Sequence, residues 1–262
     1  MRPVNSLKAT VSTRINHNAT DIGVIFDVGG TLLERIDPPE ETMAKGLSAL
    51  IDAIRKVHPN IEQVSFRNTF MQIYNDAYET AQTTCVEVDF RKMVCDSLSL
   101  QGILTNCQLE EEYEKAYYAS ELLAYRKATK VEFALETLAS RGIRLAALSN
   151  APTHWIVEQL LSIHKLEHFF DKVESSAKIR YRKPHSNAFL AVMGIWNICP
   201  ENIVVVGDTF ETDVAGADAM GVKTIWLNPT QPPRYQGICG KNLEDVVEII
   251  LRLFFKKKPD TS

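Results

Sequence analysis

The chain has 262 residues, 45% of them hydrophobic and 24% charged, which is the composition of an ordinary globular protein. Its formal net charge of -4 argues against a broad basic surface, so we expect no nucleic-acid partner. No apolar run approaches the roughly 18 to 20 residues that cross a bilayer, so we expect no membrane partner. The five cysteines form no CxxC pair, which favours reduced thiols and a cytoplasmic protein.

The chain begins with a polar segment that we expect to be a disordered tail. Residues 1–20 carry Arg2, Lys8 and Arg14, several serines and threonines, and no acidic residue. The same composition would suit an organelle targeting peptide, so that alternative stays open. Residues 256–262 form a second expected tail at the other end.

Short runs of β-branched and aliphatic residues predict four buried strands. These runs are residues 22–26, 143–148, 202–206 and 223–227. Continuous apolar runs of this length suit strands that are covered on both faces, as in a parallel sheet. Helical spacing of apolar residues lies between them, with Gly142 at an expected helix end and Ser186 as a candidate N-cap. The alternation predicts an α/β fold with a doubly wound parallel sheet.

Residues 38–127 interrupt this alternation, because they contain no convincing strand run. Apolar and aromatic residues recur there at helical spacing in four stretches, which include Met43, Phe70, Phe90 and Leu109. We therefore predict a helical domain at 38–127, inserted into an α/β core domain that consists of residues 21–37 and 128–255.

Polar residues follow the predicted strands and precede one helix. They are Asp27, Ser149, Asn150, Lys183, Asp208 and Asp213. Because the carboxyl ends of parallel strands meet at one edge of a sheet, we expect these side chains to lie close together. The acids could hold a hard cation through oxygen, and the hydroxyl, amide and lysine could hold the oxygens of an anion. The sequence therefore predicts a site for a magnesium-bound phosphoryl group.

The sequence resembles the haloacid dehalogenase superfamily at four motifs. They read FDVGGTL from Phe26, LSN from Leu148, RKP from Arg182 and VVVGDTFETDVAGADAMG from Val204. The resemblance covers about residues 22–36 and 130–230. It implies a Rossmann-like core, and the helical insert stands where this superfamily carries its helical cap.

The resemblance also implies a role for each residue of the motifs. Asp27 would be the nucleophile and would form an aspartyl phosphate. The Mg²⁺ ligands would be Asp27, Asp208 and the backbone carbonyl of Gly29, and Asp213 would bind the metal through water or brace these ligands. Phosphoryl oxygens would be bound by Ser149, Thr31 and the backbone around Asn150. Lys183 would neutralise the nucleophile and the phosphate.

Position 29 departs from the pattern of the superfamily's phosphatases, which normally carry an aspartate there. That acid protonates the leaving oxygen and then activates water, a contribution of about 10²–10⁴ in rate that glycine does not supply.

We predict a small-molecule phosphatase, monomeric or homodimeric, with altered proton transfer. Aryl and acyl phosphates should react faster than alkyl phosphates, unless the cap or the substrate lends the acid. His154 and Glu34 are candidate substitutes, and Arg91 is expected to face the substrate from the cap.

Three alternatives stay open. A phosphonatase would use a cap lysine as a Schiff base, with Lys45, Lys56 and Lys92 as possible donors. A phosphate-binding or scaffolding protein would keep the site with little turnover. A dehalogenase would need no metal, and the presence of both Asp208 and Asp213 argues against it.

Overall fold

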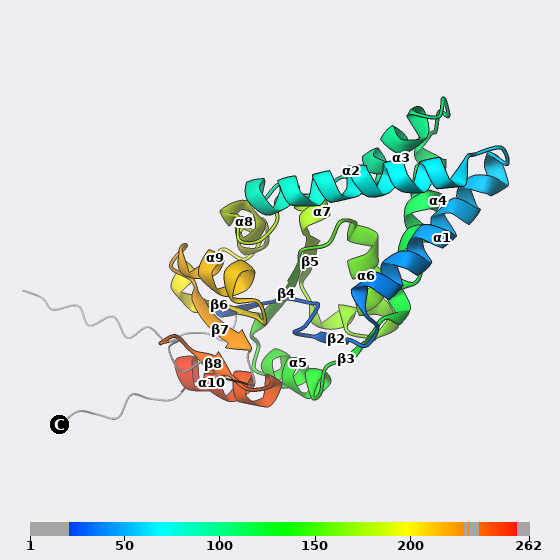
Figure 1. Cartoon of the computed structure of the whole chain (residues 1–262). Coiled ribbons are helices and arrows are strands. Elements are labelled where there is room, and N and C mark those ends of the chain that lie inside the picture. Colours follow the sequence, from blue (N-terminus) through cyan, green and yellow to red (C-terminus); the bar gives the residue numbers. More distant parts are fainter. Residues whose placement is uncertain (1–20, 228–229, 231–235, 256–262) are drawn as a thin grey trace, which may run out of the picture.

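The computed structural model describes residues 21–227, 230 and 236–255, so the expected tails at 1–20 and 256–262 lie outside the described residues. A central sheet carries helices on both faces, and a group of long helices stands beside it (Figure 1). Among the helices of these ranges, none is both long and apolar enough to cross a membrane.

The core is a six-stranded parallel sheet in the order β5-β4-β1-β6-β7-β8. Its strands are β1 Gly23–Phe26, β4 Arg144–Ser149, β5 Lys172–Ser175, β6 Ile203–Gly207, β7 Lys223–Leu227 and β8 Cys239–Gly240. The chain places β4 on one side of β1 and later returns to place β6 on the other. The polar residues that follow β1, β4 and β6 therefore meet where the strand order reverses.

The doubly wound α/β prediction is confirmed, and each of the four predicted runs forms a strand. The two edge strands β5 and β8 were not predicted. Lys172–Ser175 is short and begins with a charged residue, and Cys239–Gly240 has only two residues. Neither segment is long enough to show a hydrophobic period.

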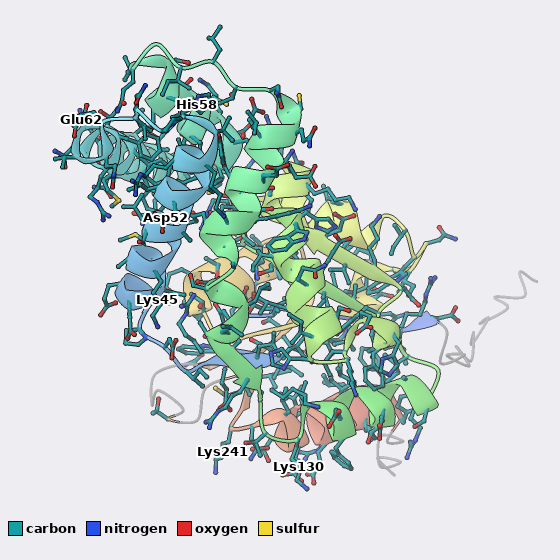
Figure 2. The ribbon with its side chains drawn as sticks, turned by 90° about the vertical axis from the view of Figure 1, so that its right-hand side faces the viewer. Lys45, Asp52, His58, Glu62, Lys130 and Lys241 are labelled. Carbon is teal, nitrogen blue, oxygen red and sulfur yellow. The ribbon has the colours of Figure 1, made fainter. Side chains whose placement is uncertain are left out.

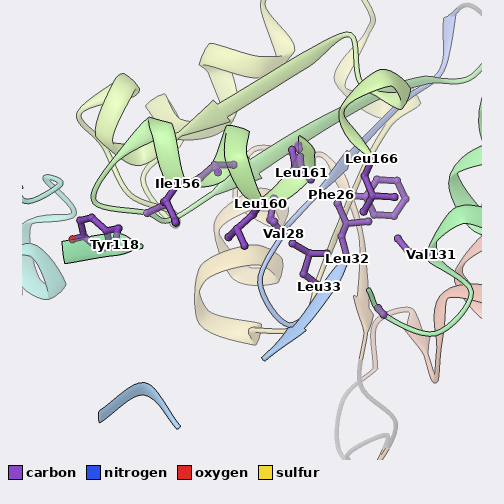
Figure 3. Packing of buried hydrophobic residues seen from close by; sticks show 14 of the residues in the cluster. Phe26, Val28, Leu32, Leu33, Tyr118, Val131, Ile156, Leu160, Leu161 and Leu166 are labelled. Carbon is purple, nitrogen blue, oxygen red and sulfur yellow. The ribbon is translucent and has the colours of Figure 1, made fainter. Parts of the chain in front are cut away.

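Alternate residues of the central strands face opposite helical layers. Val24 and Phe26 pack in the cluster that includes α5, α6 and α10, whereas Ile25 packs with α8 and α9. Figure 3 shows Phe26, Leu161 and Leu166 among the buried residues of the first of these clusters. The core helices are α5 Val131–Ser140, α6 His154–Ile163, α7 Ser176–Ile179, α8 Ser186–Met193, α9 Ala215–Asp218 and α10 Leu243–Phe255.

The helix ends follow local chemistry. Gly142 has φ 75°, which suits the glycine expected after α5. Helix α8 begins at Ser186, but its capping side chain is that of the preceding residue: His185 accepts a hydrogen bond from the backbone N–H of Asn187 at 3.1 Å. The predicted Ser186 cap is therefore wrong by one position.

The insert helices are α1 Pro39–Val57, α2 Gln63–Thr84, α3 Phe90–Ser99 and α4 Cys107–Tyr118, so the four predicted helices are confirmed. Helix α1 runs along α4, and α3 packs on both α2 and α4. An aromatic cluster fills the space between them. Phe70 and Phe90 lie 5.9 Å apart between ring centroids, and Phe90 and Tyr117 lie 4.7 Å apart. Burial of these large rings holds the insert helices together.

Two short antiparallel strands carry the chain into and out of the insert. Strand β2 (Leu33–Arg35) pairs with β3 (Tyr125–Lys127), and Arg35 stands opposite Tyr125. The prediction of no strand within 38–127 is therefore wrong at its last three residues. The sequence Tyr-Arg-Lys has no apolar alternation, so its extended conformation depends on its partner strand.

A second contact joins the loop between α2 and α3 to the core. Val86 forms a β-bridge with Tyr181, and the backbone N–H of Arg182 donates to the carbonyl of Cys85 at 2.8 Å. The buried Glu87 carboxylate forms an ion pair with the Arg182 guanidinium at 2.6 Å. The insert is thus anchored on the residue next to Lys183.

Close packing of α1 on α4 predicts the effect of one substitution. A Cβ atom at Gly46 would lie 2.4 Å from the backbone carbonyl oxygen of Tyr117, so Gly46→Ala must separate the helices. We expect the free energy of unfolding to fall by about 1–3 kcal/mol, although alanine favours helix by itself. Urea unfolding measures this. Ser48→Ala, exposed on the same helix, is the matched control. Equal stability of both variants would contradict the packing described.

Candidate active site

A cavity of about 380 Å³ opens at the carboxyl ends of β1, β4 and β6, and we call it the Asp27 cavity. Seven predicted site residues contribute to its wall together with five residues that were not predicted as ligands. The lining residues are Asp27, Gly29, Gly30, Arg35, Tyr125, Ser149, Asn150, Lys183, Asp208, Thr209, Thr212 and Asp213. The structure therefore brings together the polar residues that the sequence places after separate strands.

Lys183 lies between two buried carboxylates. Its Nζ is 2.6 Å from Oδ1 of Asp27 and 2.7 Å from Oδ1 of Asp213, and it also donates to the carbonyl of Leu148 at 3.0 Å. Lys183 is 4% exposed, Asp213 1% and Asp27 8%. The lysine is therefore a buried countercharge and not a solvated loop side chain.

The side chain of Asn150 fixes the loop that carries this lysine. Its Nδ2 donates to the Lys183 carbonyl at 2.9 Å, and its Oδ1 accepts from the Lys183 backbone N–H at 2.8 Å. Both ends of the amide are thus committed to Lys183. Ser149 and Asn150 both line the wall of the Asp27 cavity.

Burial dominates the electrostatics of the site. It raises the pKa of Asp27 from 3.8 to about 7; Lys183 counteracts this only in part, and the Asp213 carboxylate adds to it. Burial, followed by the charge of Asp213, also raises the pKa of Asp208. Burial alone would lower the pKa of Lys183, but the carboxylates of Asp27 and Asp213 outweigh it and raise that pKa. The lysine therefore stays charged, whereas its single positive charge does not offset the effect of burial on the pKa values of Asp27 and Asp208.

Two glycines let the acids approach the strand ends. A Cβ at Gly207 would lie 2.3 Å from Cγ of Asp213, and a Cβ at Gly30 would lie 2.2 Å from Oδ2 of Asp208. Gly30 also has φ 91°, which side chains rarely adopt. These positions are glycine because the carboxylates occupy the space beside the backbone.

Gly29 is different, because its backbone would accept a side chain. Its φ lies outside the left-handed region, and the nearest atoms to a Cβ there would be Oη of Tyr125 at 3.6 Å and Cε1 of the same ring at 3.8 Å. Tyr125 therefore borders the place where the usual aspartate is missing, and Arg35 lines the same cavity. Sequence reasoning missed both, and only the pairing of β2 with β3 reveals them.

Several residues considered from sequence lie elsewhere. Thr31 is fully buried and lines an adjoining cavity beside Gly30. Glu34 lines that adjoining cavity too and pairs with Arg126 at 2.8 Å. His154 and Arg91 line a third cavity, where Arg91 pairs with Glu114 at 2.8 Å. None of these four side chains borders the Asp27 cavity.

The lysines proposed as Schiff-base donors also lie away from this cavity. Lys45 projects from the outer side of α1 (Figure 2) and pairs with Glu41 at 2.8 Å. Lys56 is exposed, and Lys92 pairs with Asp96 at 2.6 Å. Among the residues that the structure describes, Lys183 is the lysine that lines the Asp27 cavity. The geometry therefore gives no support to a phosphonatase.

The three aspartates of the cavity form a possible metal-binding group. One carboxylate oxygen from each of Asp27, Asp208 and Asp213 lies within 4.8 Å of the others. Oδ2 of Asp27 is buried and has no hydrogen-bond partner among the described residues. A hard divalent cation with oxygen ligands would give this atom a partner.

Comparisons with known proteins agree with this geometry. A family model described as haloacid dehalogenase-like hydrolase matches residues 24–227. Haloacid dehalogenase-like hydrolase domain-containing protein 3 of Xenopus laevis is 26% identical over 69% of this chain and 74% of its own length. Glyceraldehyde 3-phosphate phosphatase of Methanothermobacter thermautotrophicus is 32% identical, over 43% of this chain and about half (49%) of that enzyme. The fold also matches 2-haloacid dehalogenase of Pseudomonas syringae with a TM-score of 0.66 at 20% identity, over 88% and 99% of the two chains.

The buried position of Lys183 predicts a large effect on stability. Lys183→Ala would leave Asp27 and Asp213 without their cation, so we expect the metal-free protein to lose about 3–5 kcal/mol of unfolding free energy near pH 8. The loss should shrink near pH 5.5, because Asp27 with its raised pKa is then protonated. Urea unfolding at both pH values tests this. Lys178→Ala is the control and should cost about 0–1 kcal/mol, because it removes a half-exposed lysine while Lys172 still pairs with the buried Glu174 carboxylate.

Proposed function

The chain belongs to the haloacid dehalogenase-like hydrolase family, and we propose that it is a Mg²⁺-dependent phosphatase that hydrolyses small phosphorylated molecules through an aspartyl phosphate. The observation that carries this proposal is the grouping of Asp27, Asp208 and Asp213 beside one buried ammonium group. The similarity to a phosphatase supports the same class of reaction.

The charge of the site supports the choice of metal. Three carboxylates and one ammonium group leave two negative charges uncompensated when all are ionised, and a divalent cation would balance them. We propose Asp27, Asp208 and the carbonyl of Gly29 as its ligands, with Asp213 bracing them through its bonds to Lys183 and the Thr209 N–H. Carboxylate and carbonyl oxygens favour Mg²⁺ over zinc. Such an ion would draw negative charge from the phosphoryl oxygens.

The side chains of the cavity would then carry the reaction. Asp27 attacks phosphorus with one carboxylate oxygen, and the bond to the leaving oxygen breaks. Ser149 and the backbone N–H groups near Asn150 bind phosphoryl oxygens, and Lys183 offsets the charge of Asp27 and the phosphate. Water then attacks the phosphorus of the aspartyl phosphate, which releases phosphate and restores Asp27.

We propose that residues 38–127 form a cap over a core of residues 21–37 and 128–255. Two observations support this division. The β2–β3 ribbon joins the insert helices to the sheet, and it carries two residues of the Asp27 cavity wall, Arg35 and Tyr125. The loop around Glu87 meets Arg182 beside the catalytic lysine. The cap would exclude water and select substrates by the shape of its inner surface.

A dehalogenase is the second candidate, because Gly29 supplies no acid and the fold matches a 2-haloacid dehalogenase. Such an enzyme would use Asp27 to displace halide from carbon and would need no divalent cation. The dependence of turnover on metal therefore separates the two candidates.

Turnover should require both Asp27 and Mg²⁺. With p-nitrophenyl phosphate and Mg²⁺, Asp27→Asn should lower the rate by about 10⁴-fold or more, because the amide is not a nucleophile. Excess chelator should remove activity from the wild type. The control is Asp76→Asn, an exposed acid on α2, which should react like the wild type. Full turnover on haloacids in excess chelator would overturn the phosphatase and favour the dehalogenase.

Metal binding should also be visible without any substrate. At about 100 times its Kd, Mg²⁺ should stabilise the folded protein by about 2.7 kcal/mol and raise Tm by about 5–10 °C. Above pH 3.8 the unfolded chain releases the Asp27 proton while the folded chain holds it until about pH 7, so metal-free stability falls as pH rises through this window. At one fixed Mg²⁺ concentration, the Tm shift should be larger near pH 8 than near pH 5.5, because the proton on Asp27 competes with the metal at the lower pH. Asp208→Asn should abolish it, and an unchanged shift in that variant would refute the ligand assignment.

A further inference from the structure

The hydroxyl of Tyr125 borders the space that the missing acid would use. A Cβ at Gly29 would have that hydroxyl as its nearest neighbour at 3.6 Å, and Tyr125 lines the same cavity as Asp27. Tyr125 belongs to β3, which follows the insert helices in the sequence, and it is not part of the motif that contains Gly29. An O–H group of the chain is therefore present where the usual carboxyl group is absent.

Two neighbours hold the phenol in place. The Arg35 guanidinium lies over the Tyr125 ring, 4.8 Å from its centroid, and its Nη2 donates to the hydroxyl at 3.0 Å. The hydroxyl in turn donates to Oε1 of Glu121 at 3.3 Å. Arg35 is itself fixed by an ion pair with Glu121 and by a hydrogen bond to Oγ1 of Thr42 at 3.0 Å. The ring orientation is thus determined by a network and not by packing alone.

The other cavity residues do not offer an equivalent proton. The three aspartates hold charge for the nucleophile and the metal, and Lys183 is committed to two of them. The side-chain amide of Asn150 is occupied by the Lys183 backbone. The remaining hydroxyls of the wall belong to serine and threonine, which are far weaker acids than a phenol. Tyr125 is the phenol among the described wall residues.

We propose that Tyr125 is the general acid and base of this enzyme, in place of the aspartate that Gly29 lacks. This inference rests on the proposed phosphatase function. As Asp27 attacks phosphorus and the bond to the leaving oxygen breaks, the Tyr125 O–H turns from its long 3.3 Å hydrogen bond with Glu121 toward that oxygen and gives it the proton. The phenolate that results keeps the hydrogen bond from Nη2 of Arg35, which stabilises its charge against the neighbouring Glu121 carboxylate.

The second half of the reaction returns the proton. Water attacks the phosphorus of the aspartyl phosphate while the Tyr125 phenolate takes one proton from that water. The bond between phosphorus and the Asp27 oxygen breaks, and inorganic phosphate leaves. Asp27 is again a carboxylate and Tyr125 again a phenol, so protons and electron pairs balance over the cycle.

The test is a series of phosphate monoesters with leaving groups from p-nitrophenol to simple alcohols. Tyr125→Phe should lower kcat/KM about 10²-fold for alkyl esters and less than about tenfold for p-nitrophenyl phosphate, because a nitrophenolate leaves without a proton. Gly29→Asp in the Tyr125→Phe background should restore alkyl turnover at least about tenfold, since position 29 has room for the side chain. Melting temperatures serve as the folding control.

The matched control is Tyr113→Phe on α4, which removes a buried hydroxyl that has no hydrogen-bond partner among the described residues, and it should match the wild type on every ester. Equal losses on aryl and alkyl esters in Tyr125→Phe, or no loss on either, would overturn the role of Tyr125 and leave the phosphatase standing. A wild type that binds Mg²⁺ but releases phosphate from no ester would instead refute the proposed function, and the role of Tyr125 with it.

Discussion

The ammonium group of Lys183, held between the carboxylates of Asp27 and Asp213, is the contact on which the site depends. It joins β1, the loop before α8 and the segment after β6, which lie far apart in the sequence. Buried carboxylates of this kind are costly without a cation nearby. One lysine does not balance three ionised acids, so a divalent cation beside them would offset charge that the described side chains leave uncompensated.

Much of this arrangement could be predicted from the sequence, because residues that directly follow parallel strands lie together at the carboxyl edge of the sheet. Asp27, Ser149 and Asp208 follow apolar runs directly, so a parallel sheet brings them to one edge. The burial of Lys183 could not be predicted in the same way. It depends on a contact with Asp27 across 156 positions, and a lysine in a loop is usually solvated.

Tyr125 shows the other limit of sequence reasoning. Its segment has three residues and no hydrophobic period, and its position depends on pairing with Arg35 across 90 positions. The motif at residues 26–32 shows that an acid is missing but does not show what stands beside the empty position. The helical insert could be predicted because amphipathic spacing is local, whereas the strands that attach it could not.

Mutations in the insert helices and mutations in the β2–β3 ribbon have different consequences for the site. Residues of α1 to α4 can be replaced, and these helices can be lengthened or shortened, while Arg35 and Tyr125 stay paired in the ribbon. A single residue gained or lost inside the ribbon would instead turn every later side chain of that strand to the opposite face. Lineages that carry this architecture can therefore diversify the helices of the proposed cap while Arg35 and Tyr125 stay in the wall of the Asp27 cavity.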